Sequence, residues 1–244
     1  MATFALSDLH GCMWAWEKIK SFINPDDEII CLGDLIDRGP QSWELFKTVY
    51  NDPQVTTILR GNHEDMLINA CEDYIHDDEM WDYYSYNLCY QNGGEQTLLA
   101  WEIDPERKEW LNKLKKLPTW DFFYNVNNQK IILSHAGFTP WLNHQNTECV
   151  IPPDSMLIWN REHLYEDWND REMEDVIIVH GHTTIIHLID YVSNIEESVN
   201  NIEIITYCDG HKIDIDLCTV YTNKVAILNL DTLTPIYFEK DVIK

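Results

Sequence analysis

Three short strand-like runs near the start of the chain each end in glycine and polar residues. These runs are 3–7, 28–32 and 55–59, and segments with the apolar spacing of helices separate them. Their length and their β-branched residues are typical of buried strands. A strand–helix–strand–helix–strand order predicts parallel strands, whose carboxyl ends meet at one edge of a sheet. The first third of the chain therefore predicts an α/β fold with a polar site at this edge.

The rest of the chain predicts a helical insertion followed by more strands. Residues 65–120 have helical spacing, interrupted by an aromatic segment and by a turn at Asn92-Gly93-Gly94. Runs at 121–125 and 130–133 predict a hairpin, and an apolar run predicts another strand at 175–179. An antiparallel meander is expected from five further runs, at 202–205, 213–216, 220–221, 225–230 and 235–238. We expect one domain over residues 1–244, with the insertion at about 65–120.

The charge balance and the cysteines restrict the class of partner and the compartment. The formal net charge is −25, with only 17 Lys and Arg residues, which argues against duplex nucleic acid as a partner. The seven cysteines include no CxxC pair and mostly lie in apolar runs, which indicates reduced, buried thiols. The sequence shows no signal peptide, and no apolar run approaches the ~20 residues that span a bilayer. We therefore expect a soluble, cytoplasmic protein without membrane association.

Polar residues with metal-binding chemistry follow five of the predicted strands. They are Asp8, His10, Asp34, Asn62, His135 and His182. Asp8 and His10 are two positions apart on an extended segment, so both side chains can point toward one centre. Carboxylate and imidazole donors without thiolate suit divalent ions such as Mn²⁺, Fe²⁺ or Zn²⁺. One carboxylate can bridge two such ions ~3.5–4 Å apart, and Asp34 in the central segment is the candidate.

Three residues beside these donors have side chains that suit phosphate chemistry. Arg38 offers planar, paired donors for phosphate oxygens. His63 directly follows Asn62, where it can act as a general acid, and Asp37 can orient its ring. The sequence thus predicts a metal and phosphate site.

Other polar residues near these segments receive structural interpretations. His180 lies beside His182, and we expect it at a strand end or behind the ligands rather than as a ligand itself. Arg60 is expected to brace loops. Asp214 and Asp216 alternate with isoleucine on a predicted strand, which favours a solvated face or a place behind the ligands. Surface positions are expected for five histidines that match no motif, namely His76, His144, His163, His187 and His211.

The motifs occur in an order that resembles a known family. In sequence they are Asp8-x-His10, Gly33-Asp34-x-x-Asp37-Arg38-Gly39, Gly61-Asn62-His63-Glu64, His135-Ala136-Gly137 and Gly181-His182-Thr183. Together they resemble the phosphoprotein phosphatase family of calcineurin-like metallophosphoesterases. The Gly-His-Thr form, the short length and the Asn-Gly-Gly segment look more like its bacterial and phage branch. The resemblance implies an α+β sandwich of two mixed β-sheets flanked by helices, with a helical cap insertion.

The resemblance also implies a cofactor of two divalent metal ions, with Mn²⁺ expected and Fe or Zn as alternatives. The first ion would bind Asp8, His10 and Asp34, and the second would bind Asp34, Asn62, His135 and His182. Arg38 and Arg161, the latter in Trp159-Asn160-Arg161-Glu162, would bind the phosphoryl oxygens together with Asn62. His63 with Asp37 would protonate the leaving oxygen, while a metal-activated hydroxide attacks phosphorus in line.

The substrate stays open between two phosphoester classes. A protein serine/threonine phosphatase is the main expectation, because an acidic surface that includes Glu72–Glu79 would repel a polyphosphate and suit basic peptides. The alternative is a symmetrical bis(5'-nucleosyl)-tetraphosphate hydrolase, which shares all five motifs. A non-catalytic binding scaffold on the same fold is a third possibility. The family's glycine-rich ending is replaced by Leu217-Cys218 and Thr222-Asn223, which alters the mouth of the site.

Overall fold

The three strands predicted at the start of the chain are the parallel part of a five-stranded sheet. The computed structural model describes residues 1–76, 83–138, 141–142, 149–150, 152–165, 176–193 and 195–241. In the first sheet the strand order is β12-β11-β1-β2-β3, and β1, β2 and β3 run parallel. The strands of this sheet are β1 (Thr3–Leu6), β2 (Glu28–Cys31), β3 (Val55–Ile58), β11 (Lys224–Asn229) and β12 (Thr234–Glu239). The predicted parallel arrangement is confirmed.

A second five-stranded sheet contains the later strands, in the order β4-β5-β8-β10-β9. The predicted hairpin β4–β5 is antiparallel, whereas β5, β8 and β10 are parallel to one another. The strands are β4 (Trp120–Tyr124), β5 (Lys130–Ser134), β8 (Val176–His180), β9 (Ile205–Tyr207) and β10 (Lys212–Asp214), and a separate pair is β6 (Trp141–Leu142) and β7 (Cys149–Val150).

The predicted antiparallel meander at the end of the chain is wrong. Its segments divide between the two sheets: β9 and β10 pair in the second, and β11 and β12 pair in the first. The run at 220–221 belongs to a short helix instead of a strand. Apolar alternation identifies strands but carries no information about which neighbour each strand will pair with.

The two sheets pack face to face across a shared apolar core. In β1, Ala5 faces the second sheet, whereas Phe4 and Leu6 on either side of it pack against helices. The inner core joins residues of both sheets, among them Ile30, Leu133 and Val179. This alternation is what a two-residue side-chain period produces in a strand that is covered on both faces. The predicted sandwich of two mixed sheets is therefore confirmed.

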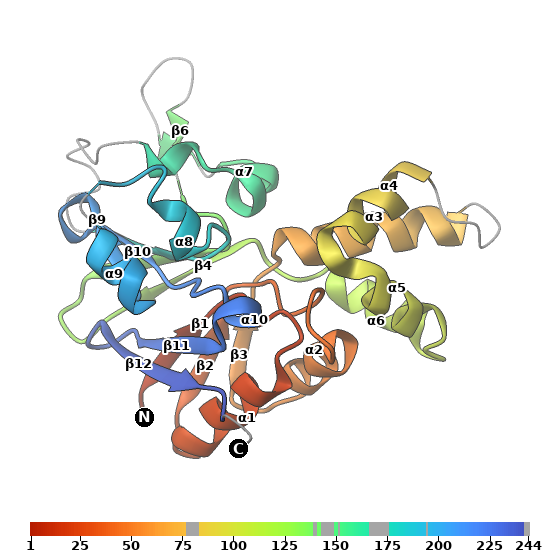
Figure 1. Cartoon of the computed structure of the whole chain (residues 1–244), viewed down its shortest axis with the longest axis horizontal. Coiled ribbons are helices and arrows are strands. Elements are labelled where there is room, and N and C mark those ends of the chain that lie inside the picture. The colour runs from red at the N-terminus through yellow and green to blue at the C-terminus, as the bar shows by residue number, and fades with distance from the viewer. Residues whose placement is uncertain are drawn as a thin grey trace.

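Helices cover the outer face of the first sheet and extend beyond it (Figure 1). Helices α3 to α6 occupy the region of the predicted insertion and project to one side of the sheets. Among the described residues, no helix combines the length and the apolar character that a membrane span requires. The helices are α1 (Met13–Phe22), α2 (Ser42–Tyr50), α3 (Asn62–His76), α4 (Tyr83–Cys89), α5 (Glu95–Glu102), α6 (Arg107–Leu114), α7 (Asp154–Trp159), α8 (Ile185–Leu188), α9 (Glu196–Asn201) and α10 (Thr219–Thr222).

Candidate active site

The carboxyl ends of strands from both sheets are joined by backbone hydrogen bonds. The Asp8 nitrogen donates to the Gly33 carbonyl at 3.2 Å, and the His10 nitrogen donates to the Asp34 carbonyl at 3.0 Å. In the second sheet the Gly181 nitrogen donates to the His135 carbonyl at 2.9 Å. These bonds hold the predicted metal-binding segments in one place.

The backbone of this region is held in conformations that non-glycine residues rarely adopt. Positive φ angles occur at Asp8, His10, Asp34, Asp37, Arg38 and His182. Such residues cost free energy and persist only where the surroundings impose them, most often at functional sites. Gly61 shows how tight the packing is, because a Cβ there would lie 2.6 Å from the Asp34 nitrogen. The glycines of the motifs therefore allow close approach of the loops.

Two groups of buried donors share Asp34. One consists of Asp34, His10 and His63, the other of Asp34, Asp8 and His135, and in each the potential ligand atoms lie within 4.8 Å of one another. The Nδ1 atoms of His10 and His135 lie 2.7 Å and 2.9 Å from backbone carbonyls of Ile36 and Leu32. Nδ1 of each ring is thus occupied, and Nε2 faces Asp34, at 3.6 Å in His10 and 3.4 Å in His135, which is the orientation of metal-binding histidines.

Asn62 and His182 extend the second group. The Asn62 Oδ1 atom lies 3.0 Å from His135 Nε2 and 2.8 Å from His182 Nδ1. His182 Nε2 is buried without a hydrogen-bond partner among the described residues. Buried nitrogen and oxygen donors that face each other without compensating groups fit divalent cations. The predicted donor residues therefore have the chemistry of a site for divalent metal ions.

The pKa shifts at the site also favour a bound cation. Burial would raise the pKa of Asp34, but the imidazoles of His135 and His63 hold it well below its usual range. Burial would lower the pKa of His135, but Asp34 outweighs this effect and raises it to about 9. The centre therefore keeps a buried carboxylate ionised and places positive charge beside it, which is the electrostatic task of a bound cation.

Arg38, His63 and Asp37 form a hydrogen-bonded chain beside the donors. His63 Nδ1 lies 2.7 Å from Asp37 Oδ2, and both side chains are fully buried. Arg38 Nη2 donates to His63 Nε2 at 2.8 Å, and Nη1 donates to His10 Nε2 at 2.6 Å. Burial would lower the pKa of His63, but Asp34 and the Asp37 hydrogen bond raise it. The Asp37 contact is therefore the one predicted for an acid pair.

The predicted turn at residues 92–94 contacts the phosphate-binding candidate. The Arg38 nitrogen donates to the Gly93 carbonyl at 2.9 Å. Gly93 has a φ of +92°, and a Cβ at this position would lie 3.0 Å from Arg38 Cγ. The helical insertion thus fixes the position of Arg38, a connection that the sequence pattern did not indicate.

A cavity of about 430 Å³ adjoins these groups. Arg161 and Arg38 line it together with His182, so both predicted arginines face the same cavity. The other lining residues are Thr183, Thr184, His187, Asp190, Tyr191, Cys218 and Tyr221. Arg161 itself follows the end of α7 and precedes a short turn of 3₁₀ helix at Glu162–Leu164.

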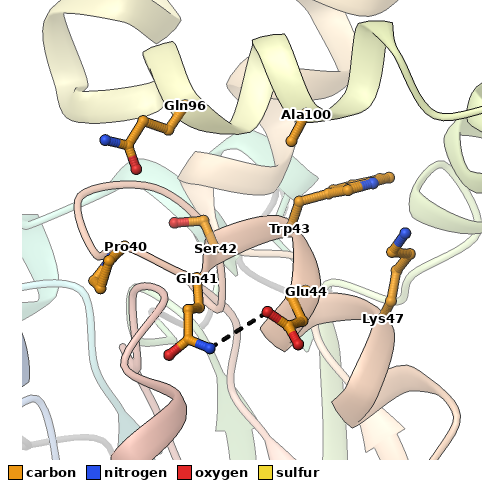
Figure 2. A pocket seen from close by; sticks show the side chains of 8 residues that line it. All are labelled: Pro40, Gln41, Ser42, Trp43, Glu44, Lys47, Gln96 and Ala100. Atoms are coloured by element: carbon orange, nitrogen blue, oxygen red, sulfur yellow. Dashed lines mark hydrogen bonds between the residues drawn. The ribbon is translucent and has the colours of Figure 1, made fainter.

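A second cavity, of about 260 Å³, lies between the start of α2 and α5 (Figure 2). Gln41 and Gln96 face it from opposite sides, and Gln41 donates to Glu44 at 3.3 Å. Its only basic lining residue among the described residues is Lys47, whose ammonium group already contacts Asp104 at 2.8 Å. It contains none of the predicted metal donors, so the chemistry belongs to the larger cavity.

Several structural interpretations need correction. His163 is buried, with its ring against Gly137 and 4.8 Å from the His180 ring, instead of on the surface. Asp214 and Asp216 are buried, and burial raises both pKa values well above the usual range, which excludes the solvated face and agrees with the other expected place, behind the ligands. His76 and His187 are exposed as predicted, His211 is half-buried, and His144 lies outside the described residues.

The remaining interpretations agree with the structure. Arg60 donates to the Lys115 carbonyl at 3.2 Å and thus braces the end of α6, as predicted. His180 is fully buried and its Nε2 lies 2.7 Å from the Tyr207 hydroxyl, behind His182. Buried free thiols are confirmed at four of the described cysteines, which are Cys12, Cys31, Cys71 and Cys89.

Glu64 has a role that the sequence analysis missed. Its buried carboxylate accepts hydrogen bonds of 2.9 Å from the backbone nitrogens of Asp34, Leu35 and Gly61. Burial, with Asp34 nearby, raises the pKa of Glu64 to about 7. The motif Gly61-Asn62-His63-Glu64 held the signal, because an acid at the start of a helix can bind free N–H groups. Glu64 joins the β2 loop to the β3 loop.

Replacing Glu64 by alanine should lower the free energy of unfolding of the metal-free protein by about 3 kcal/mol or more, because each orphaned buried N–H costs about 1–3 kcal/mol. Glu64→Gln keeps one carbonyl oxygen as an acceptor and should lose less. Urea denaturation of both variants and the wild type measures the difference. Equal stability of Glu64→Ala and the wild type would contradict this role.

Comparison with known proteins agrees with this geometry. A sequence model of the calcineurin-like phosphoesterase family matches residues 1–218. The chain belongs to this family. The predicted fold and the predicted membership of the metallophosphoesterase family are confirmed, and divalent metal is the family's cofactor.

Two curated relatives of this phosphoesterase share one name. A protein of Buchnera aphidicola subsp. Acyrthosiphon pisum (strain Tuc7), named symmetrical bis(5'-nucleosyl)-tetraphosphatase, is 31% identical over 57% of this chain and 46% of its own length. A protein of the same name from Aliivibrio salmonicida (strain LFI1238) is 25% identical over 77% of this chain and 65% of its own. The chain thus matches about half to two thirds of these curated relatives.

The solved structure of a protein serine/threonine phosphatase from Saccharomyces cerevisiae shares the fold of this phosphoesterase. The TM-score is 0.57 at 12% identity, covering 100% of this chain and 81% of the other. At this identity the likeness shows the fold alone. The relatives' names therefore favour the alternative substrate class over the expected protein phosphatase.

Proposed function

We propose that this phosphoesterase hydrolyses dinucleoside polyphosphates, with symmetrical cleavage of the tetraphosphate chain. The observation that carries the proposal is the cavity of about 430 Å³ beside the metal-donor groups. Two arginines and two tyrosines, Tyr191 and Tyr221, line it. A substrate with several phosphates and a nucleoside would contact both kinds of side chain.

The roles of the site residues in this proposal follow their contacts. Asp8, His10 and Asp34 would hold one divalent ion, because His10 Nε2 lies 3.9 Å from Asp8 Oδ1 and 3.6 Å from Asp34 Oδ2. A second ion would bind Asp34 and three further donors, which are Asn62, His135 and His182. When bound, the ions supply positive charge for the phosphate oxygens and acidify a water nucleophile. Manganese is our expectation for the ion, since oxygen and imidazole donors without thiolate suit it.

The chain's own groups orient the substrate and move the proton. Arg38 and Arg161 would bind phosphoryl oxygens, because guanidinium groups offer paired donors to them. The same phosphate would displace Arg38 from the imidazole nitrogens of His10 and His63 that it now contacts. Once Arg38 no longer donates to it, Nε2 of His63 can take a proton from solvent, and His63, held by Asp37, would donate this proton to the leaving phosphate oxygen.

The position of the acidic segment in the structure does not favour a protein substrate over a polyphosphate. The acidic segment begins at the far end of α3, on the other side of the molecule from α8 (Figure 1). Residues 77–79 of that segment lie outside the described residues. A charge that is remote from the cavity is screened by salt within about 10 Å, so it does not oppose a polyphosphate at the two arginines.

A side-by-side kinetic assay tests this proposal. Metal-loaded protein is assayed on diadenosine tetraphosphate, a phosphothreonine peptide and para-nitrophenyl phosphate, with bound metal quantified in each preparation. We expect kcat/KM to be highest for the dinucleotide, by at least roughly tenfold, and chelation to abolish all activities. An inert dinucleotide with rapid release of phosphate from the peptide would instead support the protein phosphatase function.

A further inference from the structure

Helix α10 presents an exposed tyrosine at the mouth of the active-site cavity. Tyr221 is 73% exposed and lines the cavity. The helix is anchored at its start, where the Cys218 nitrogen donates to Asp216 Oδ1 at 2.8 Å and Thr219 is buried. It is also anchored at its end, because Thr222 Oγ1 donates to the Leu217 carbonyl at 2.9 Å. Tyr221 is therefore an apolar ring held outside the core on a fixed turn.

A second tyrosine lines the same cavity from another element. Helix α8 buries Ile185 and Leu188, and the turn after it brings Asp190 and Tyr191 to the cavity. The Tyr191 ring lies 5.0 Å from the Tyr165 ring in an edge-to-face arrangement, which restricts its orientation. Aromatic rings thus line the cavity from α10 and from the segment after α8, while the two arginines form its phosphate end.

Polar groups line the same cavity as the arginines and the tyrosines. Thr183 is 2% exposed, and its hydroxyl has no hydrogen-bond partner among the described residues. Asp190 is exposed and offers carboxylate oxygens to the same space. A hydroxyl and a carboxylate suit the hydroxyls of a ribose or the amino group of a base. The cavity therefore carries groups for phosphate, for a sugar and for a flat ring.

We propose that Tyr221 and Tyr191 form a nucleobase subsite, in which the base of a nucleotide stacks on the tyrosine rings while its phosphates contact Arg38 and Arg161. The subsite rests on the proposed function, and it names the residues that separate nucleotides from other phosphoesters. Stacking on an aromatic ring tolerates any base, because every base has a π face. Specificity among bases is accordingly weak at the rings, and Asp190 is the group that can add to it.

Equilibrium binding tests the subsite without requiring hydrolysis. The ligands are ADP and pyrophosphate, titrated into metal-loaded protein in a calorimeter, because both carry a diphosphate and only ADP carries a base. We expect ADP to bind at least roughly tenfold more tightly than pyrophosphate. Tyr221→Ala should weaken ADP binding roughly 5- to 100-fold, the usual worth of one stacking contact, and leave pyrophosphate binding unchanged.

Two control variants make the result specific. Tyr221→Phe keeps the ring and should stay within about twofold of the wild type, since stacking requires no hydroxyl. Tyr124→Ala removes another exposed tyrosine, 52% exposed on β4 and outside the cavity, and should change neither affinity. Because Tyr221 is exposed, its replacement leaves the core intact, and circular dichroism of the variant checks this.

Three outcomes would overturn the subsite. The first is equal affinity of the wild type for ADP and pyrophosphate, and the second is an equal loss of both affinities in Tyr221→Ala. A phosphotyrosine peptide is titrated in parallel, because its flat ring could also stack there, and the third outcome is that Tyr221→Ala weakens binding of this peptide without weakening binding of ADP. If ADP shows the expected behaviour but diadenosine tetraphosphate is not hydrolysed, the proposed function fails and the nucleotide subsite stands.

Discussion

Replacing His63 by asparagine should lower the turnover of diadenosine tetraphosphate by roughly 10²–10⁴-fold, the usual contribution of a general acid. His63 is buried between Asp37, at 2.7 Å from its Nδ1, and Arg38, at 2.8 Å from its Nε2. Asparagine can fill part of this space but cannot donate a proton at neutral pH. Steady-state kinetics of the variant, with metal content measured by mass spectrometry, checks the prediction.

The metal content decides between two roles for His63. Its ring nitrogen also belongs to a donor group with His10 and Asp34, so the geometry alone would permit a ligand. We expect two ions per chain in both the wild type and His63→Asn. Asp37→Asn should lower turnover by roughly 10–100-fold, because the Asp37 carboxylate only orients the His63 ring. Loss of one ion in His63→Asn would make His63 a ligand and end its assignment as the acid.

Asp34→Asn should have the larger effect, because Asp34 is the one residue common to both donor groups. Both ions should bind more weakly, and turnover should fall by more than the roughly 10²–10⁴-fold expected from loss of an acid. Asparagine keeps the Oδ1 acceptor for the backbone nitrogen of His63, which lies 3.0 Å away, so the fold should be retained. Metal content and the metal-induced rise in Tm measure the binding directly.

Asp214→Asn is the matched control for this variant. Asp214 is also fully buried, but it belongs to neither donor group, and burial raises its pKa well above the usual range, which favours the protonated form. An amide is close in shape and charge to a protonated carboxyl group, so metal content and turnover should stay near wild-type values. Full metal occupancy in Asp34→Asn would contradict a bridging role for Asp34.

The part of the site that follows strand ends could be predicted from the sequence. Asp8, Asp34 and His135 each follow a short apolar run, and parallel strands necessarily bring such positions to one edge. The structure places them within one donor group. Their proximity follows from local pattern together with the rule for parallel sheets.

Buried polar residues could not be predicted in the same way. The sequence favours a surface position for His163 and leaves Asp214 open between a solvated face and a place behind the ligands, whereas both are buried among polar neighbours. Burial of such groups depends on long-range pairing, since β10 lies parallel to β8 although more than thirty residues separate them. Hydrophobic periodicity reports which residues face a core, but it does not report which polar residues are enclosed by other segments.

The substrate cavity could not be predicted from the sequence motifs either. Its walls come from five separate stretches, around Arg38, Arg161, His182, Tyr191 and Tyr221. Only the first three stretches carry a motif residue. The departure at 217–223, where the family's glycine-rich ending is replaced, indicated a changed mouth but not its chemistry. The fold turns this departure into an anchored helix with an exposed tyrosine.

Product analysis in H₂¹⁸O tests the central claim most directly. Metal-loaded protein is incubated with diadenosine tetraphosphate in the labelled water, and the product nucleotides are separated and their masses measured by mass spectrometry. The account predicts two ADP molecules per substrate, one of which carries a single ¹⁸O, and no exchange into the other. Formation of AMP with ATP, or an intact dinucleotide under conditions in which a phosphopeptide is hydrolysed, would contradict it.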